Sequence, residues 1–387
     1  MDPTRDPDPL ASRLRGFGTT IFAEMSALAE RTGAINLGQG VPDDGPPPEV
    51  LDAAIAAIRA GRNQYPPGPG VPALREAVAA HRRRFWGIDL DPDTEVLVTV
   101  GATEAIAAAV LALCEPGDEV VAFQPTYDSY GAAVAMAGAQ LRPVTLRGPD
   151  FALDVDELRD AVTPRTRLLL VNSPHNPTGR VLGDDELTAI ADLCVERDLI
   201  AVTDEVYEHL VFDGVHRPLS TFPGMAERTL SISSAGKTFS CTGWKVGWAT
   251  GPAALVAATR TAKQFLTFTA GGPFQEAVAV GLGLDDDVFR ARCDALRTRR
   301  DVLCAGLERA GFGVRPPAST YFVTADIGPL GADDGVEFCR SLPERCGVVA
   351  VPTSVFFDDP RLGARLVRFA YCKDLALLEE AVERLVA

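Results

Sequence analysis

The segment SISSAGKTFSCTGWKVGW spans residues 231–248 and connects two β-branched runs of the chain, 229–233 and 246–250. Lys237 therefore comes just after a predicted buried strand, among small residues. A lysine in such a place can be desolvated, which lowers its pKa and allows the neutral amine to form a Schiff base. A lone lysine more often lies in an exposed surface loop, and for this segment taken by itself that alternative stays open.

The tripeptide Gly236-Lys237-Thr238 is also found at the end of the phosphate-binding loop of nucleotide triphosphatases. That loop requires a further glycine at the position where this chain has Ser231. The missing glycine disfavours a nucleotide triphosphatase.

Candidate strands and helices alternate along the chain before this segment. Short β-branched runs are the candidate strands, and amphipathic segments rich in alanine, leucine and glutamate are the candidate helices. The strands are predicted at 96–100, 119–123, 168–172, 200–204, 229–233 and 246–250, and the helices at 103–113, 130–138, 156–162 and 184–197. The alternation predicts an α/β fold with a mostly parallel central sheet covered on both faces. Ligands of such sheets bind at the carboxyl ends of the strands.

The pattern changes after residue 283. A charged helix is predicted over 290–309, and candidate strands at 321–325 and 366–371 precede a closing helix. This order predicts a second, smaller α+β domain. The glycine- and proline-rich stretch 37–48 is where we expect an amino-terminal arm to cross between the domains. We therefore predict a large domain over 46–285 and a small domain formed by 1–45 and 286–387.

Composition argues against several classes of partner. The chain has 387 residues, 47% of them hydrophobic, which is enough for a large buried core. Lysine and arginine number 37 against 53 acidic residues, a net charge of −16, so neither nucleic acid nor an anionic membrane surface is an expected partner. The eight cysteines are scattered without a CxxC pair, which indicates reduced thiols and no metal site.

The sequence shows no sign of membrane insertion or secretion. Its longest uncharged apolar run, 105–114, is far shorter than the ~20 residues of a membrane span. The first residues, MDPTRDPDPLASRLRG, are polar and proline-rich and lack the apolar stretch of a secretory signal. We therefore expect a cytoplasmic protein.

Polar residues follow several of the candidate strands. Asp204 ends the apolar strand in DLIAVTDEVYEHL, and a carboxylate in a mostly apolar site needs a cationic partner, which a protonated pyridine nitrogen would supply. Asn176, in NSPHNPTG, can present its amide inward. VTVGATEAI places Gly101, Ala102 and Thr103 at a strand-to-helix turn, where free N–H groups bind anions. Taken singly, Asn176 could be only a turn residue and Gly101 only a tight corner.

In this order, the segments resemble the class I/II aminotransferases, the fold type I enzymes that use pyridoxal 5′-phosphate (PLP). The matching motifs run along nearly the whole chain: LGQGVPD from residue 37, NQYPPGPG from 63, VTVGATEAI from 98, PTYDSY from 125, NSPHNPTG from 172, TDEVYEHL from 203, SSAGKTFSCTGWKVGW from 233 and LVRFAYCKD from 366. Within the class the chain is most similar to the kynurenine/methionine aminotransferase branch and to the actinobacterial N-succinyldiaminopimelate aminotransferases, with which it shares FAEMSALA and DEVYEHLVFD. The resemblance makes the 46–285 domain the PLP-binding one.

The resemblance also implies how the cofactor is held. Lys237 would form the Schiff base and carry the proton, and Asp204 would pair with the pyridine nitrogen. Tyr207 and Asn176 would hydrogen-bond the phenolic oxygen, while Tyr127 would stack on the ring. The residues expected around the phosphate are Ala102, Thr103, Ser234 and Lys245, with Tyr65 from a second subunit.

Toward the substrate, the resemblance implies that Arg368 binds the α-carboxylate with two parallel hydrogen bonds, a geometry that lysine cannot reproduce. Asn176 and the backbone N–H of Gly40 would assist it. Tyr65 and Phe268 match positions that relatives place in a neighbour's active site, so we predict a two-fold homodimer with shared sites.

The implied reaction moves an amino group between an amino acid and a 2-oxo acid, and we expect the N-succinyl-L,L-diaminopimelate/glutamate type. An enzyme of the same fold repurposed for elimination, oxidation or ring formation is the alternative. Two departures from the family favour it: Ser319 stands beside the expected substrate where relatives usually have glycine, and Thr126 stands where they tend to have an aromatic residue.

A ligand-sensing regulator is the alternative from another class, since some regulators carry this domain behind a DNA-binding segment. The acidic chain shows no such segment, so we do not expect one. His175, next to Asn176, is either a substrate contact or a turn residue. His81, His209 and His216 show no spacing that groups them, and we assign them no common role.

Overall fold

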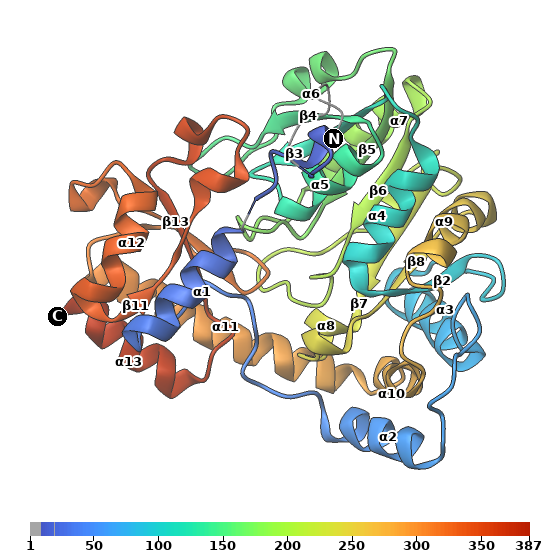
Figure 1. The fold of residues 1–387 in the computed structure, drawn as a ribbon, viewed down its shortest axis with the longest axis horizontal. Helices are drawn as coiled ribbons and strands as arrows, with labels where there is room; N and C mark the ends of the chain where they lie inside the picture. The colour runs from blue at the N-terminus through green and yellow to red at the C-terminus, as the bar shows by residue number, and fades with distance from the viewer. Residues whose placement is uncertain (1–8, 19) are drawn as a thin grey trace.

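The computed structural model of this chain describes residues 9–18 and 20–387. Residues 1–8 and 19 lie outside the described part. They include part of the stretch considered for a secretory signal and part of the predicted amino-terminal arm. Figure 1 shows a larger body built around one long sheet and a smaller body beside it, which contains the carboxyl terminus. Within the described ranges, no helix combines the length and the apolar character that a membrane crossing requires.

A seven-stranded sheet forms the centre of the larger body. Its strands are β2 (Val96–Val100), β3 (Glu119–Gln124), β4 (Gln140–Thr145), β5 (Thr166–Asn172), β6 (Ile200–Asp204), β7 (Thr229–Ser234) and β8 (Val246–Thr250). Their order is β2-β8-β7-β6-β5-β3-β4, and the neighbours from β7 to β4 are parallel. The predicted α/β class with a mostly parallel sheet is therefore confirmed.

Strand β8 departs from parallel pairing, because it runs antiparallel to both β2 and β7. Only residues 235–245 connect β7 to β8, and they contain the short helix α8 (Ala235–Thr238) and one 3-10 turn. A parallel crossover needs a dozen or more residues, usually with a full helix. The segment that carries Lys237 is too short for one, so the chain turns back.

The sequence analysis missed β4, at the edge of the sheet. Its sequence QLRPVT contains a proline, and its first residues are partly exposed. A proline cannot donate to a ladder and is tolerated on an edge strand, so this segment lacks the β-branched apolar pattern of the central strands.

Alternate residues of the central strands enter two different cores. In β3, Val121 and Phe123 pack on one face of the sheet, and Val120 and Ala122 pack on the other. Because helices cover both faces, the strands read as continuous apolar runs. The helices of the larger body are α2 (Pro48–Arg59), α3 (Pro72–Trp86), α4 (Gly101–Leu113), α5 (Asp128–Met136), α6 (Val155–Ala161), α7 (Asp184–Glu196), α8, α9 (Ala253–Leu266) and α10 (Gly272–Leu282).

The smaller body contains an antiparallel four-stranded sheet of order β12-β13-β10-β9 and a parallel pair, β1 with β11. Its strands are β1 (Ile35–Asn36), β9 (Gly313–Val314), β10 (Phe322–Asp326), β11 (Val348–Val349), β12 (Val351–Pro352) and β13 (Leu366–Ala370), and its helices are α1 (Ile21–Thr32), α11 (Asp286–Arg309), α12 (Gly335–Cys346) and α13 (Leu375–Val386). The 3-10 turns of the described chain are η1 (Ser12–Leu14), η2 (Leu219–Thr221), η3 (Thr242–Trp244), η4 (Gly328–Leu330), η5 (Thr353–Phe356) and η6 (Pro360–Gly363).

Helix α1 shows how the amino-terminal arm is placed. The Thr20 side chain accepts a hydrogen bond from the Ala23 N–H at the start of the helix, and Gly33, at φ 65°, ends it in the left-handed region. The chain then pairs as β1 with β11 and crosses to α2, which packs on α10 in the larger body. The exact domain boundaries stay a prediction.

Candidate active site

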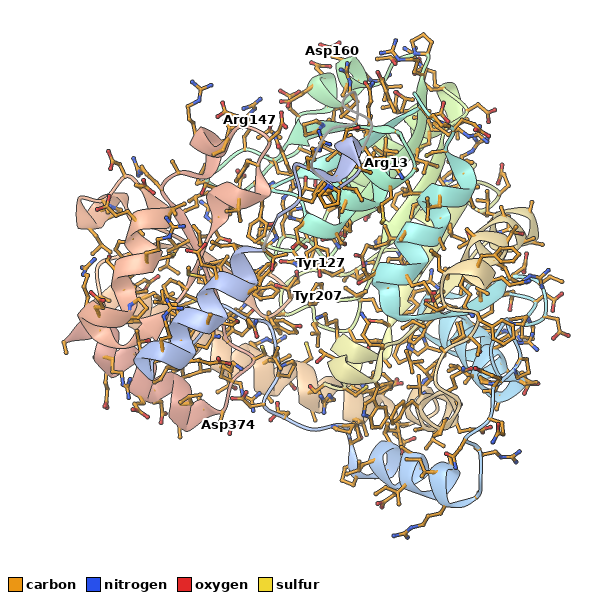
Figure 2. All side chains as sticks on the ribbon, in the orientation of Figure 1. Arg13, Tyr127, Arg147, Asp160, Tyr207 and Asp374 are labelled. Carbon is orange, nitrogen blue, oxygen red and sulfur yellow. The ribbon has the colours of Figure 1, made fainter. Side chains whose placement is uncertain are left out.

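A cavity of about 340 Å³ lies where the carboxyl ends of β5, β6 and β7 meet α1 and β13 of the smaller body. Tyr127 and Tyr207, both labelled in Figure 2, lie between the two bodies. The structure brings every predicted site residue to this cavity except Tyr65, namely Gly40, Ala102, Thr103, Tyr127, Asn176, Asp204, Tyr207, Ser234, Lys237, Lys245 and Arg368.

Lys237 lies in α8, one turn after β7, and it lines the cavity. Its Nζ is 5.9 Å from the centre of the Tyr207 ring and 5.4 Å from that of Tyr321. Desolvation by the surrounding protein lowers the pKa of its amine to about 8. Lys237 is therefore a half-buried helical residue that lines a cavity close to two aromatic rings, and the surface-loop alternative is wrong.

Asp204 ends β6 and is 5% exposed. Its Oδ2 accepts a hydrogen bond of 2.6 Å from the Tyr130 hydroxyl, and its Oδ1 accepts one of 3.3 Å from the Val206 N–H. Burial raises the pKa of this carboxyl, although both hydrogen bonds oppose the rise. Among the described residues no lysine, arginine or histidine forms an ion pair with it. A protonated pyridine nitrogen would supply the cation that this buried carboxylate needs.

The sequence analysis missed Tyr130. It lies three residues after Tyr127 in PTYDSY, on the same side of α5, and the two rings meet edge to face at 5.7 Å between centroids. This i,i+3 spacing was the available signal, because a residue one helical turn from a predicted ring-stacking tyrosine faces the same space.

The amino terminus of α4 forms an anion-binding corner with Ser234 and Lys245. Gly101 has φ 72°, and a Cβ added there would lie 3.2 Å from the Lys245 Nζ. The first N–H groups of a helix lack intrahelical partners, and they carry the positive end of its dipole. These donors, with a hydroxyl and an ammonium group, suit the phosphate of PLP.

Arg368, in β13, is 2% exposed. Its Nη1 donates to Asn176 Oδ1 and its Nη2 to the Gly38 carbonyl, both at 3.1 Å. Its Nε has no hydrogen-bond partner among the described residues. The rings around the guanidinium carbon belong to Phe322 at 4.0 Å, Phe22 at 5.0 Å and Phe356 at 5.3 Å. A buried guanidinium with a free donor and no carboxylate partner suits an anionic ligand.

Asn172 and His175 shape the loop that presents Asn176. Asn172 accepts a hydrogen bond from the Asn176 N–H and donates one to the Asp204 carbonyl, both of 2.9 Å, so it ties the loop to β6. His175 contacts Thr178 within its own turn, at 2.8 Å, and burial lowers the pKa of its imidazole to about 3. This geometry matches the turn-residue interpretation of His175.

The two departures from the family pattern do not enter the cavity. Ser319 is buried and donates a hydrogen bond of 2.8 Å to the Gly179 carbonyl. Thr126 donates its hydroxyl to the Phe123 carbonyl. Neither is among the described residues that line the cavity, so the expectation that Ser319 adds a side chain beside the substrate is wrong.

The expectation that three of the histidines are unrelated is also wrong. His81 Nε2 lies 2.7 Å from His209 Nε2, and His216 Nε2 lies 3.5 Å from Glu205 Oε2. These contacts form where α3 packs on the loop after β6. Sequence spacing contains no trace of them, because His81 and His209 are 128 residues apart.

Comparison with known proteins identifies the class. The model of the family "Aminotransferase class I and II" matches residues 32–385. The chain is 58% identical to a protein named probable N-succinyldiaminopimelate aminotransferase from Mycobacterium tuberculosis, over 97% of both chains. It is 39% identical to the methionine aminotransferase of Escherichia coli, over 99% of both.

Solved structures of aminotransferases have the same fold as this chain. The N-succinyldiaminopimelate aminotransferase of M. tuberculosis superimposes with a TM-score of 0.96, covering 97% of this chain and 99% of that one. The E. coli methionine aminotransferase gives 0.94 at 39% identity, covering 98% and 100%. The chain belongs to the class I and II aminotransferases, which are PLP-dependent enzymes of fold type I. Elimination, oxidation or ring formation is not favoured, because these relatives are named as aminotransferases.

Proposed function

We propose that this aminotransferase exchanges an amino group between N-succinyl-L,L-diaminopimelate and the glutamate/2-oxoglutarate pair. The 58% identical relative supports the substrate class. The observation that carries the chemistry is the meeting of Lys237, Asp204 and Arg368 in one cavity.

In the proposed site, PLP supplies an aldehyde for the exchange and a ring that accepts electrons from the substrate. Asp204 holds the proton of the ring nitrogen, and Tyr130 and Val206 hold Asp204. Tyr207 and Asn176 would hydrogen-bond the phenolic oxygen, and Tyr127 would stack on the ring. Ala102, Thr103, Ser234 and Lys245 would hold the phosphate.

Lys237 moves the proton. Since its pKa is lowered to about 8, part of the amine is neutral near physiological pH, and its Nζ could take a proton from the substrate Cα and deliver it to the former aldehyde carbon of the cofactor. The rings of Tyr207 and Tyr321 limit where the Nζ can move. One amine in one position then serves both transfers.

Arg368 orients the substrate. Its free Nε and its Nη groups offer the α-carboxylate a planar set of donors, and the rings of Phe22, Phe322 and Phe356 exclude water from that contact. Binding the carboxylate in one plane fixes the direction of the Cα–H bond relative to Lys237.

The dimer is a second part of the proposal. Tyr65 is 82% exposed and touches Phe268 at 5.5 Å between ring centroids, outside its own cavity. Phe265 and Leu266 are exposed beside them. We propose that this apolar surface, defined by Tyr65, Phe265, Leu266 and Phe268, packs on a second copy of the chain and that Tyr65 completes the phosphate site of that copy.

The reaction is tested with purified protein loaded with PLP. Glutamate alone should bleach the near-visible band and yield 2-oxoglutarate, and N-succinyl-L,L-diaminopimelate should do the same with its own 2-oxo product. We expect kcat/KM for N-succinyl-L,L-diaminopimelate to exceed the values for methionine and kynurenine by about tenfold or more, a preference of ~1.4 kcal/mol. Preference for methionine or kynurenine would contradict the substrate class, and release of free ammonia from these amino acids in place of the aminated cofactor would contradict transamination.

A further inference from the structure

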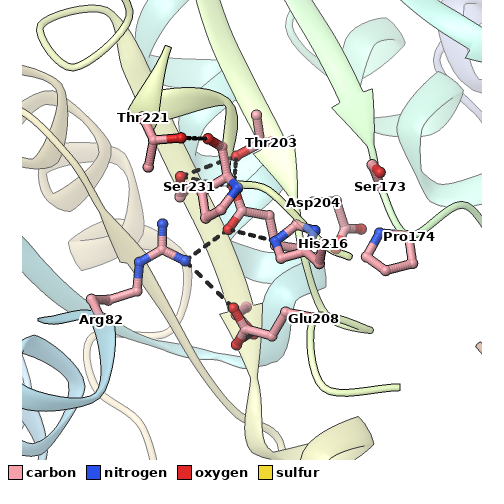
Figure 3. Close-up of polar contacts among 12 residues, drawn as sticks. Arg82, Ser173, Pro174, Thr203, Asp204, Glu208, His216, Thr221 and Ser231 are labelled. Atoms are coloured by element: carbon pink, nitrogen blue, oxygen red, sulfur yellow. Dashed lines mark hydrogen bonds and ion pairs between the residues drawn. The ribbon is translucent and has the colours of Figure 1, made fainter. Parts of the chain in front are cut away.

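A buried polar network joins α3 to the carboxyl ends of β6 and β7, and Figure 3 shows its contacts around Arg82. Its central group is the guanidinium of Arg82, which is 2% exposed. Arg82 Nη1 lies 2.7 Å from Glu205 Oε2 and 3.4 Å from Glu208 Oε2. Neither of these glutamates lines the cavity, and no step proposed above uses them.

Both glutamates belong to the turn that presents the cofactor contacts. Glu205 follows Asp204 directly, and Glu208 follows Tyr207. The Glu208 N–H donates to the Glu205 carbonyl at 2.9 Å, so the turn is closed on itself. The two carboxylates therefore belong to the same short turn as Asp204 and Tyr207.

The other ends of the two carboxylates reach the strand that leads to Lys237. Ser231 donates to Glu205 Oε1 at 3.0 Å, and Ser233 donates to Glu208 Oε1 at 2.7 Å. Both serines lie in β7, which ends at Ser234, three residues before Lys237. The network thus connects α3, the turn with Asp204 and Tyr207, and the strand before the lysine.

The cation that these carboxylates hold is the guanidinium. Glu205, Glu208 and His216 offer ligand atoms within 4.8 Å of one another, a spacing that would also suit a metal ion. Arg82 Nη1 already lies within ion-pair distance of both carboxylates, and the Arg82 side chain packs on the Trp86 ring at 4.9 Å. A metal ion bound there would be repelled by the positive charge of the Arg82 guanidinium.

Removing Arg82 would leave two buried carboxyl groups without the cation that they share. Even with Arg82 present, burial raises the pKa of Glu208 to about 8, and the neighbouring charge of Glu205 adds to this rise. Burial also raises the pKa of Glu205, but Arg82 and His216 hold it well below its usual range. Without the guanidinium the two carboxylates would repel each other or take up a proton, and the turn would shift.

We propose that Arg82 is a positioning residue of this enzyme: through Glu205 and Glu208 it sets the turn that carries Asp204 and Tyr207 against the strand that leads to Lys237. The inference rests on the proposed placement of PLP against these residues. It predicts that Arg82 governs the affinity for PLP and the pH at which the bound cofactor changes its absorbance, although Arg82 touches neither cofactor nor substrate.

The test compares Arg82→Met with Arg83→Met. Arg83 is the next residue of α3, but its side chain is 73% exposed and pairs with the exposed Asp89. In Arg82→Met we expect PLP to bind about tenfold more weakly or worse. We also expect the pH midpoint of the near-visible absorbance to move by about half a unit or more. In Arg83→Met both values should equal those of the unmodified enzyme.

A milder pair covers the case in which Arg82→Met does not fold. Ser233→Ala removes only the hydrogen bond to Glu208, and its control Thr229→Val removes a buried hydroxyl of the same strand that has no hydrogen-bond partner among the described residues. Ser233→Ala should weaken PLP binding several-fold and shift the absorbance midpoint in the same direction as Arg82→Met, whereas Thr229→Val should change neither.

The two readouts separate positioning from mere stability. A purely structural role would lower the thermal midpoint of the protein and leave PLP affinity and the absorbance midpoint unchanged, and that result overturns the inference; if Arg82→Met is insoluble, the same result with Ser233→Ala overturns it. If the unmodified enzyme itself gives no near-visible band with PLP, the placement of the cofactor fails instead.

Discussion

Lys237, Asp204 and Arg368 are three ionisable side chains around one cavity, and the last two are incompletely paired. Asp204 has no cationic ion-pair partner and Arg368 Nε no acceptor within the described chain. Leaving such groups incompletely paired costs free energy in the free protein. A ligand that brings a cation for Asp204 and a carboxylate for Arg368 recovers that free energy, which is why these residues define a binding site.

Replacing Arg368 by lysine tests the recognition of the carboxylate. Lysine keeps the charge but loses the planar set of donors, so we expect kcat/KM for glutamate to fall about 10- to 100-fold, mainly through KM. Steady-state kinetics measure the change. Arg365→Lys is the control, since Arg365 precedes β13, is exposed and pairs with Asp326. Equal KM values for the two variants would contradict this role of Arg368.

Tyr130→Phe tests the support of Asp204. The variant removes the 2.6 Å hydrogen bond to Oδ2 and further raises the pKa of a carboxyl that burial already raises, so less of the carboxyl is ionised and available to pair with a protonated ring nitrogen. We expect PLP to bind about tenfold more weakly, because hydrogen bonds to charged groups contribute ~1.5–3 kcal/mol. Tyr371→Phe, which removes another buried hydroxyl outside the cavity, should leave the measured dissociation constant unchanged.

At the scale of elements, the phosphate corner depends on how closely β8 approaches α4. A Cβ added to Gly247 in β8 would lie 2.6 Å from the backbone carbon of Gly101 and 2.8 Å from the Ala102 nitrogen. These are backbone atoms, which cannot rotate away as a side chain can. The two elements can therefore meet only if position 247 has no side chain, and their contact places the N–H groups of α4 in the cavity.

Gly247→Ala should separate β8 from α4. We expect a loss of ~1–3 kcal/mol in the free energy of unfolding, as for other overpacked sites, together with weaker PLP binding. Denaturant unfolding and a PLP titration measure the two effects. Gly243→Ala, in η3, is the matched control because no atom lies within 4 Å of the added Cβ. An unchanged affinity in Gly247→Ala would show that the corner tolerates the separation.

At the scale of the whole molecule, the apolar surface of Tyr65, Phe265, Leu266 and Phe268 is shaped by buried polar groups. Lys263, 1% exposed, donates to the Gly68 and Phe268 carbonyls at 2.8 and 2.9 Å. Gln275 accepts from the Val71 N–H and donates to the Ala270 carbonyl. These side chains hold the loop with Tyr65 against the loop with Phe268, so both present one surface to a partner.

Mixing two inactive variants tests whether Tyr65 acts in the partner subunit. Lys237→Ala lacks its own amine, and Tyr65→Ala lacks the side chain it would lend. A mixed dimer contains one complete site only if Tyr65 crosses the interface, and random exchange should then restore about a quarter of the activity. Sedimentation checks that dimers form. No recovery from exchanged dimers would place Tyr65 outside the partner's site.

Buried histidines predict how stability depends on pH. Burial lowers the pKa of His175 and of His209 to about 3, below the ~6.5 of an unfolded histidine. Between these values the unfolded chain binds more protons, so stability falls as pH decreases below 6.5, by up to ~1.4 kcal/mol per pH unit for each group. Glu208, with its raised pKa, acts in the opposite direction between about 4.5 and 8.

The comparison of unmodified protein with His175→Gln isolates one histidine. Urea unfolding at pH 7.5, 6.5 and 5.5 measures the free energy of unfolding. In the variant this free energy should fall less steeply as the pH decreases, by up to ~1.4 kcal/mol per pH unit. Equal slopes would mean that His175 takes up its proton in the folded state.

The sequence by itself predicted six of the seven strands of the central sheet and about half of the residues that line the cavity. Apolar runs in the sequence predict most of the central strands. The polar residues that follow these runs lie close together because parallel strands end at the same edge of a sheet. The resemblance then gave each of these residues an expected role. Lys237, Asp204, Asn176 and Arg368 could all be named in this way, and the structure places them together.

Only the tertiary structure decided the contacts between these residues and their supports. The hydrogen bond from Tyr130 to Asp204, the contact of His81 with His209 and the ion pairs of Arg82 join residues far apart in the chain. Arg82 and Glu205 are 123 positions apart. Local patterns report which side of an element is buried, whereas the partner of a buried polar group is set by how the elements pack, because any neighbour with the right charge could satisfy it.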